Sequence, residues 1–369
     1  MRIAMDYQIF CLQAYGGISR YFVRLAEQFS ERSETVRIFS PLHCNEYLDG
    51  LTPSLVDGRR IISSASKAMR LTLPYNNFMS GRKISVWQPD ILHETYYSFF
   101  NKKTQKKPVV ITVYDMVHEI FPDQFSSFGN ISLRKRNAVQ RADHIICISE
   151  STRRDLIRLF NVDDAKVSVV HLGFDKFSYQ PSSDHSIESR IVNPYLLFVG
   201  NRGGYKNFAG FLKAFSLSDR LKESFDIISF GGGAFTPDEK SLIADLGLSA
   251  SKVRQLAGGD DTLGNLYRGA AIFVYPSLYE GFGLPPLEAM ANDCPVALSS
   301  TSSMPEVVGE AGAYFDPSSV EDMSLVIDRL AFSPSLSRAL IESGRERLKK
   351  FSWENCAEHT LAVYRELVR

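Results

Sequence analysis

Two glutamates, Glu280 and Glu288, bracket a segment that is rich in glycine and proline. The segment follows an apolar run, 271–275, which is typical of a buried strand, and it leads into residues that we interpret as a helix. A loop from a strand to the following helix lies at the carboxyl end of that strand, where open α/β sheets bind ligands. Glycines let the backbone approach a ligand, and a helix start offers N–H groups to an anion. The pattern predicts a clamp for a phosphate and a sugar, with ordinary loop chemistry and helix-dipole complement as the alternative.

A second loop carries two cations, Arg202 and Lys206, among glycines. It follows a strand expected at 195–199 and precedes a helix expected at 208–217. Cations beside a helix start suit a pyrophosphate. The loop is not a Walker loop, because no Gly-Lys-Ser/Thr follows. The alternative for Lys206 is a solvated charge at the helix start.

The first half of the chain offers two further candidates. Gly16 and Gly17 lie between a first strand, 1–6, and a helix, where they allow a phosphate or sugar to approach or simply make a tight turn. A central strand expected at 109–113 delivers Asp115 and His118 to its carboxyl end. A lone histidine is more often structural, and Asp115 could orient it or cap a turn.

These motifs resemble the retaining family 4 glycosyltransferases, whose signature has a glutamate, seven intervening residues and a second glutamate, with Gly-Phe-Gly-Leu-Pro between them. The Gly-Gly loop, the Asp-x-x-His stretch and the Arg/Lys loop also follow the family's order. The spelling of three stretches, 15–21, 115–119 and 203–207, is similar to bacterial mannosyltransferases of O-antigen or exopolysaccharide assembly. The second half carries the stronger match.

The resemblance implies a role for each motif. Glu288 would bind the ribose and Glu280 the sugar hydroxyls, while Arg202, Lys206 and the N–H groups near Gly283 would hold the diphosphate. The expected catalytic residues are Glu280, His118, Lys206 and Arg202. The expected substrate-binding residues are Gly16, Gly17, Asp115, Asn201, Arg202, Lys206, Arg254, Glu280, Gly281, Phe282, Gly283, Leu284 and Glu288.

The expected fold class is α/β, in the GT-B arrangement of two Rossmann-like, doubly wound parallel-sheet domains that face each other across a cleft. At 369 residues the chain exceeds what one core usually supports, in agreement with two domains. We expect an acceptor-side domain at 1–177, a polar linker at 178–193, and a nucleotide-sugar domain at 194–350. A last helix, 351–369, would return to the first domain.

The composition of the chain favours some classes of binding partner over others. Residues 1–180 hold 24 Lys and Arg against 18 Asp and Glu, and the remainder has the opposite excess. No arginine-rich helix or aromatic RNA-binding motif appears, which argues against nucleic acid. Scattered cysteines and the absence of a signal peptide predict a cytoplasmic protein. Aromatic residues at 96–100 beside lysines at 102–107 suggest peripheral contact with an anionic inner membrane, with a solvated loop as the alternative.

The predicted activity is transfer of a hexose, with retention, from GDP-mannose to a glycan or polyprenyl-diphosphate-linked acceptor of surface polysaccharide synthesis. UDP-GlcNAc, UDP-glucose or dTDP-rhamnose are alternative donors. An epimerase of the same architecture, or a non-catalytic subunit in a complex with other assembly enzymes, is the alternative of another class. We expect no cofactor and no metal, because Asp260 and Asp261 are interpreted as a helix cap with dipole complement.

Overall fold

The structure is a computed structural model, and it describes residues 1–61, 66–98, 100, 107–125, 130–175, 191 and 193–369. The chain divides into two compact units, one made of Met1–Gly173 with Phe351–Arg369 and the other of Phe174–Lys350. The second unit thus begins before the linker predicted at 178–193, most of which lies outside the described residues. The lysines at 102–106 also lie outside them.

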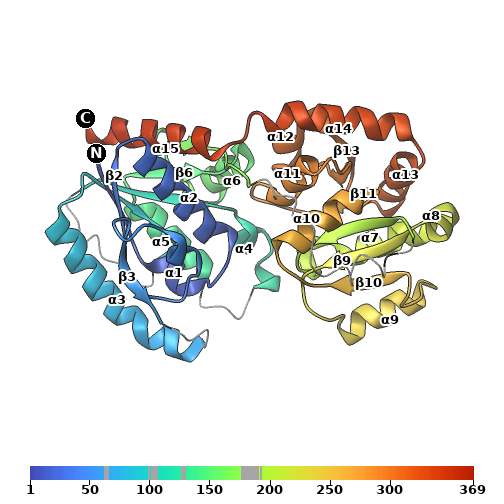
Figure 1. The fold of residues 1–369 in the computed structure, drawn as a ribbon, viewed down its shortest axis with the longest axis horizontal. Helices are drawn as coiled ribbons and strands as arrows, with labels where there is room; N and C mark the ends of the chain where they lie inside the picture. Colours follow the sequence, from blue (N-terminus) through green and yellow to red (C-terminus); the bar gives the residue numbers. More distant parts are fainter. Residues whose placement is uncertain (62–65, 99, 101–106, 126–129, 176–190, 192) are drawn as a thin grey trace. The chain divides into compact units, whose positions relative to one another are not determined.

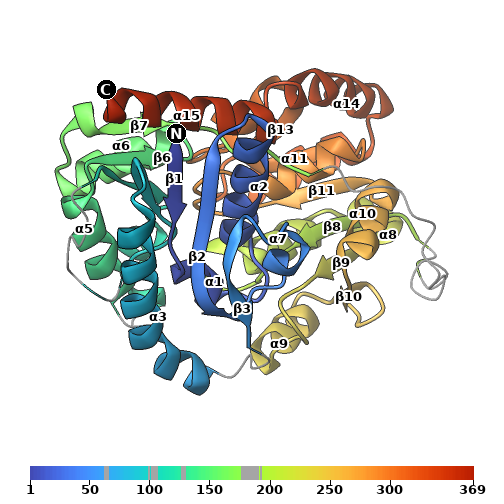
Figure 2. The ribbon, with the colours of Figure 1, turned by 60° about the vertical axis from the view of Figure 1, so that its left-hand side comes forward.

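The first unit is built on a parallel sheet of seven strands in the order β3-β2-β1-β4-β5-β6-β7, part of which is seen in Figure 2. Its strands are β1 (Arg2–Met5), β2 (Thr35–His43), β3 (Val56–Arg60), β4 (Ile91–Glu94), β5 (Val109–Val113), β6 (His144–Cys147) and β7 (Val167–Val169). Every residue of β5 is buried, as expected for a strand with a helix layer on both faces. The strand order is that of a doubly wound sheet, and its switch point lies between β1 and β4.

Among the described residues of the first unit, the helices lie between these strands or after them. They are α1 (Gln8–Leu12), α2 (Gly17–Glu31), α3 (Ser66–Trp87), α4 (Val117–Ile120), α5 (Ile131–Arg141), α6 (Glu150–Phe160) and α15 (Trp353–Val368). Helix α15 packs beside α2, as Figure 1 shows. Its Tyr364 hydroxyl is bonded to the His93 ring, and both side chains are fully buried. The end of the sequence thereby completes the core of the first unit.

The second unit repeats this plan with a six-stranded parallel sheet in the order β10-β9-β8-β11-β12-β13. The strands are β8 (Tyr195–Val199), β9 (Asp226–Phe230), β10 (Val253–Leu256), β11 (Ile272–Tyr275), β12 (Val296–Ser299) and β13 (Gly312–Phe315). Its helices are α7 (Phe208–Leu217), α8 (Asp219–Ser224), α9 (Pro237–Asp245), α10 (Asp260–Gly269), α11 (Leu284–Ala291), α12 (Met304–Val308), α13 (Val320–Ala331) and α14 (Pro334–Leu348). The switch point lies between β8 and β11.

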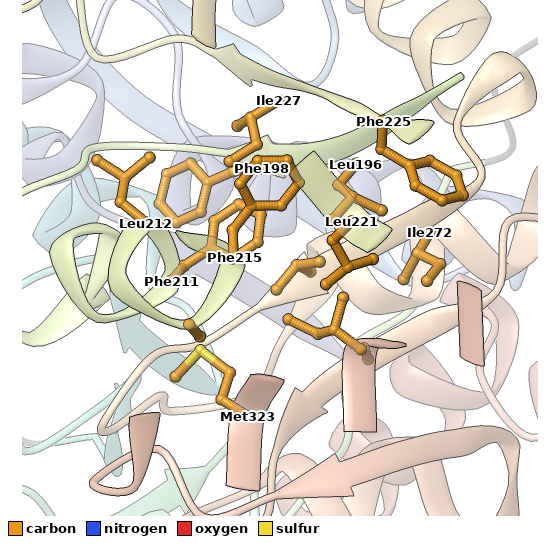
Figure 3. Close-up of a cluster of buried hydrophobic side chains, with 14 of the residues drawn as sticks. Leu196, Phe198, Phe211, Leu212, Phe215, Leu221, Phe225, Ile227, Ile272 and Met323 are labelled. Carbon is orange, nitrogen blue, oxygen red and sulfur yellow. The ribbon is translucent and has the colours of Figure 1, made fainter. Parts of the chain in front are cut away.

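Helix α7 shows why this core forms. Phe208, Phe211, Leu212 and Phe215 recur at helical spacing and are all buried. Three of them are labelled in Figure 3, where they pack against Phe198 of β8 and neighbouring apolar side chains. The apolar face of α7 is thereby fixed on the sheet, and the loop before it is held at the carboxyl end of β8.

Helix α3 runs to Trp87 with Pro74 inside it. One sequence expectation differs from the structure. Gly259, not an aspartate, is the N-cap of α10, and Asp260 and Asp261 occupy its first turn, where they still complement the helix dipole.

Candidate active site

The site is built at the switch point of the second sheet, where the loops after β8 and β11 leave side by side. Hydrogen bonds join these loops. The Leu278 N–H donates to the Tyr205 carbonyl at 2.7 Å, and the Asn207 amide donates to the Pro276 carbonyl at 3.2 Å. Another joins Lys206 to Glu280. The two motifs that the sequence separates by more than seventy positions therefore form one structure.

The Lys206 ammonium donates to the Glu280 carboxylate at 2.6 Å, with side chains that are 20% and 12% exposed. Lys206 also lies over the ring of Tyr275, at 5.7 Å from its centre. Burial, and secondly the charge of Glu280, raise the pKa of Tyr275 well above its ordinary value. A cation and a carboxylate, both within reach of solvent, thus face each other at the carboxyl edge of the sheet.

The glycine-rich segment after Glu280 is held from the following loop. Ser302 accepts the Glu280 N–H at 3.0 Å, and the Ser303 hydroxyl donates to the carbonyls of Glu280 and Phe282. Gly283 is the N-cap of α11 with a φ of 112°, and no side chain caps this helix. A side chain there would also collide with Met304, because an added Cβ would lie 2.6 Å from the methionine methyl group. The following loop therefore holds the segment in place, and the positive φ at 283 favours glycine.

Two of the predicted ligands on this segment are largely buried. Glu288 is 7% exposed and accepts a 3.4 Å hydrogen bond from the Tyr267 hydroxyl. Burial, and then the charge of Glu288, raise the pKa of Tyr267. Phe282 is 3% exposed, so its ring serves packing. Leu284 is half-buried at the helix start, where its N–H belongs to the first turn.

Arg202 does not point at this place. Its side chain is 2% exposed and forms an ion pair with Glu239 at 2.7 Å. Its remaining donors reach the carbonyls of residues 231–234. Asn201, next to it, is exposed. The structure thus gives Arg202 a set of protein partners in place of the open position expected of a diphosphate ligand.

The Arg254 side chain also lies elsewhere. Its guanidinium pairs at 3.2 Å with Asp226, the first residue of β9. That contact lies at the amino end of the strand, whereas the loops of the site leave from the carboxyl end. The Arg254 guanidinium thus has a protein partner away from the loops of the site.

The first unit has its own polar cluster at the corresponding switch point. The Asp6 carboxylate, after β1, accepts a 2.7 Å hydrogen bond from the Thr95 hydroxyl, after β4. Burial raises the pKa of Asp6, although these hydrogen bonds act in the opposite direction. Glu94 is paired with Arg141, yet burial raises the pKa of Glu94 to about 7.

Gly16 is the N-cap of α2 and Gly17 its first residue, and Gly16 leaves room for the Gln13 side chain.

His118 lies in α4, after the central strand β5. Its ring packs on Phe125 with 4.4 Å between centres, and its Nδ1 atom is buried with no hydrogen-bond partner among the described residues. Burial lowers the pKa of His118, so the ring is neutral at neutral pH. Asp115 accepts the Val117 N–H at 3.0 Å. Of the two roles considered for Asp115, the structure shows the turn cap.

Lys135, a buried polar residue beside Asp115 and Glu119, was not singled out from the sequence. Its side chain is 1% exposed, and its ammonium lies 2.7 Å from Glu119 and 2.8 Å from the Asp115 carbonyl. It brackets His118 by bonding the residues on either side of it. The available signal was spacing, because Lys135 shares a helix face with the buried Ala138 and Val139. Ser302 and Ser303 were likewise not among the predicted site residues.

The described residues contain neither a metal-binding cluster nor a membrane-spanning helix. No group of three or more histidine, cysteine, aspartate or glutamate side chains there is arranged to hold a metal ion. No helix there has both the length and the apolar character needed to cross a membrane. The expectation of a metal-independent reaction stays a prediction.

Comparison with known proteins gives matches over most of the chain. The family model described as "Glycosyltransferase Family 4" matches residues 15–176, and the model "Glycosyl transferases group 1" matches residues 184–347. O-antigen chain mannosyltransferase B of Escherichia coli is 32% identical over 62% of this chain and 62% of its own length. MMP alpha-(1->4)-mannosyltransferase of Mycolicibacterium hassiacum is 31% identical over 65% of this chain and 58% of its own length. The matched region therefore spans about three fifths of these relatives.

A solved structure has the same fold along the whole chain. Sucrose-phosphate synthase from Thermosynechococcus elongatus superimposes with a TM-score of 0.77, 18% identity, and coverage of 99% of this chain and 98% of that one. At this identity the likeness concerns the fold alone. It confirms the expected pair of Rossmann-like parallel-sheet domains.

Proposed function

The chain belongs to the family 4 glycosyltransferases and has their GT-B fold, and from this premise we propose that it transfers mannose from GDP-mannose, with retention of configuration, to a glycan or polyprenyl-diphosphate-linked acceptor. The product belongs to surface polysaccharide synthesis. Two relatives, each about one third identical over the matched region, are named mannosyltransferases, which supports mannose over other hexoses.

The contact between Lys206 and Glu280 carries this proposal. A cation suited to a diphosphate and a carboxylate suited to sugar hydroxyls lie 2.6 Å apart. In a nucleotide-sugar, the diphosphate and the sugar are joined by one bond, and this is the bond that transfer breaks. The pair lies at the switch point of a doubly wound sheet, the general ligand position of such folds.

In the proposed reaction the bond between the sugar and the diphosphate breaks, and the acceptor hydroxyl attacks from the same face. Lys206 and the amide groups at the start of α11 stabilise the charge on the departing phosphate, which takes the acceptor proton. Glu280 binds the sugar and favours an oxocarbenium-like transition state. Glu288 binds the ribose. No metal takes part.

We further propose a cytoplasmic enzyme that meets its lipid-linked acceptor at the inner membrane surface. The lysines that suggest this contact include Lys107, which is exposed. Anionic lipid attracts such residues at low ionic strength.

Thermal-shift measurements with GDP, UDP, ADP and dTDP test the donor. We expect GDP alone to raise the melting temperature substantially. GDP-mannose turnover is then measured with and without a purified polyprenyl-diphosphate-linked oligosaccharide, and the anomeric configuration of the product is determined by NMR.

Acceptor-dependent release of GDP with an α-linked product supports the proposal. Stabilisation by another nucleotide alone contradicts the mannose donor. An isomerised nucleotide-sugar without transfer identifies an epimerase, and GDP binding without turnover identifies a non-catalytic subunit.

A further inference from the structure

The Arg202 guanidinium is bound on all sides by protein acceptors. Its Nε lies 2.7 Å from the Glu239 carboxylate, and its terminal nitrogens lie between 2.9 and 3.3 Å from the carbonyl oxygens of residues 231–234. It also stacks on the Phe235 ring at 4.7 Å. A planar fork of donors can bind a carboxylate and several carbonyls together, which an ammonium cannot. Four consecutive carbonyls thus converge on one cation.

This convergence requires an unusual backbone. Gly231, Gly232 and Gly233 have φ values of 87°, 70° and 71°, the left-handed region that other residues rarely adopt. Glu239 is itself fixed, because it closes a capping box with Thr236 at the start of α9. Arg202 therefore joins the loop after β8 to the turn after β9 and to the helix that follows.

The position of the carbonyls determines where the amides point. In a trans peptide the N–H is directed opposite to the C=O of the same unit. The N–H groups of Gly232, Gly233 and Ala234 therefore point away from Arg202, and all three residues are exposed. They lie at the carboxyl edge of the sheet, where Gly231 approaches the backbone of Gly200.

We propose that Arg202 is a positioning residue of the donor site: its guanidinium holds the carbonyl side of the 231–234 turn, so that the amide side binds a phosphate oxygen of a nucleoside diphosphate. Arg202 itself does not contact the nucleotide. This inference rests on the proposed function for the ligand. The arrangement of the turn does not depend on it.

Glu239 supplies the decisive variant. If Arg202 contacted phosphate directly, Glu239→Gln would release its guanidinium, and GDP would bind as tightly as before or more tightly. If Arg202 positions the turn, Glu239→Gln loosens it, and the GDP affinity falls about tenfold, as expected for the loss of a charged hydrogen bond. Arg202→Lys keeps the positive charge but loses the fork, so it should weaken GDP binding to a similar degree.

Two glycines provide a matched pair of variants. An added Cβ at Gly232 would lie 2.7 Å from the Arg202 guanidinium, whereas one at Gly233 would meet nothing within 4 Å. Their φ values are nearly equal, so alanine is equally strained at both. Gly232→Ala should therefore weaken GDP binding more than Gly233→Ala does.

Calorimetric titration of the full chain with GDP, and with UDP in parallel, measures these affinities, and circular dichroism verifies folding. NMR of glycine-labelled protein without nucleotide is the independent readout, and in Arg202→Lys and Glu239→Gln the amide signals of glycines 231–233 should shift. Unchanged signals, or undiminished affinity of Glu239→Gln, overturn the inference. If the wild-type protein binds neither nucleotide, the proposed function fails, and the NMR result still decides the role of Arg202.

Discussion

Replacing Glu280 with glutamine should strengthen the binding of GDP while abolishing transfer. The carboxylate lies 2.6 Å from the Lys206 ammonium. A phosphate bound to the same ammonium from its other side would lie about 6 Å from the carboxylate. With an effective dielectric constant of about 40, between the surface and bulk values, their repulsion is about 1.4 kcal/mol, which corresponds to about tenfold in affinity. Glutamine removes this repulsion and retains a hydrogen-bonding side chain.

The affinity is measured by calorimetry with GDP, and transfer by release of GDP from GDP-mannose in the presence of acceptor. Glu223→Gln is the matched control, because Glu223 is exposed on α8, before the amino end of β9. It should change neither quantity. Lys206→Met should lower the GDP affinity by about tenfold or more, because a charge-assisted hydrogen bond to phosphate is lost. Weaker GDP binding by Glu280→Gln, or transfer at a normal rate, would refute the assignment of Glu280 to the sugar.

Three further predictions concern metal dependence and two buried residues of the first unit. EDTA should leave the rate of transfer unchanged, and strong inhibition that added Mg²⁺ reverses would overturn the metal-free reaction. Lys135→Met leaves the buried Glu119 carboxylate without its cation and should lower the free energy of unfolding by about 3–5 kcal/mol in urea denaturation; adding Glu119→Leu should recover most of this loss. Burial lowers the pKa of His93 to about 3. Below about pH 6.5 the unfolded chain therefore takes up a proton that the folded protein excludes, so stability should fall by about 1.4 kcal/mol per pH unit between these values. His93→Gln should reduce that slope, and an unchanged slope would show that another group causes it.

Local apolar patterns were sufficient to predict the elements that carry the site. The residues of β5 are all buried, and the helix at 208–217 has the predicted limits. The last helix, predicted at 351–369, spans 353–368. Loops after parallel strands meet at one edge of a sheet, so the proximity of Lys206 and Glu280 also follows from the predicted topology.

Contacts made by polar side chains could not be predicted in the same way. Helix α3 continues past Pro74 because Asn76 and Ser80, both buried, bond to the backbone of β2. Asn76 binds Leu42 at the point where the register of β2 and β3 shifts. A bulge in one strand and an amide on a distant helix have no shared pattern in the sequence.

Arg202 illustrates a further limit. Its type and position fit a phosphate ligand, and only the direction of its side chain toward Glu239 shows another use. Arginine donates to phosphate, carboxylate and carbonyl oxygens alike, so residue type cannot separate these partners. The same reasoning applies to Arg254, whose guanidinium is bound by Asp226.

The inclusion of residues 351–369 in the first unit has a consequence for biosynthesis. Domains generally fold as they leave the ribosome, amino-terminal first. Here the buried His93 cannot form its hydrogen bond until Tyr364 has been synthesised, so the domain that is translated first is completed last. The second domain is continuous and can finish folding earlier. During translation the second domain can therefore fold while the first is still incomplete. A premature stop before residue 351 would leave the core of the first domain exposed.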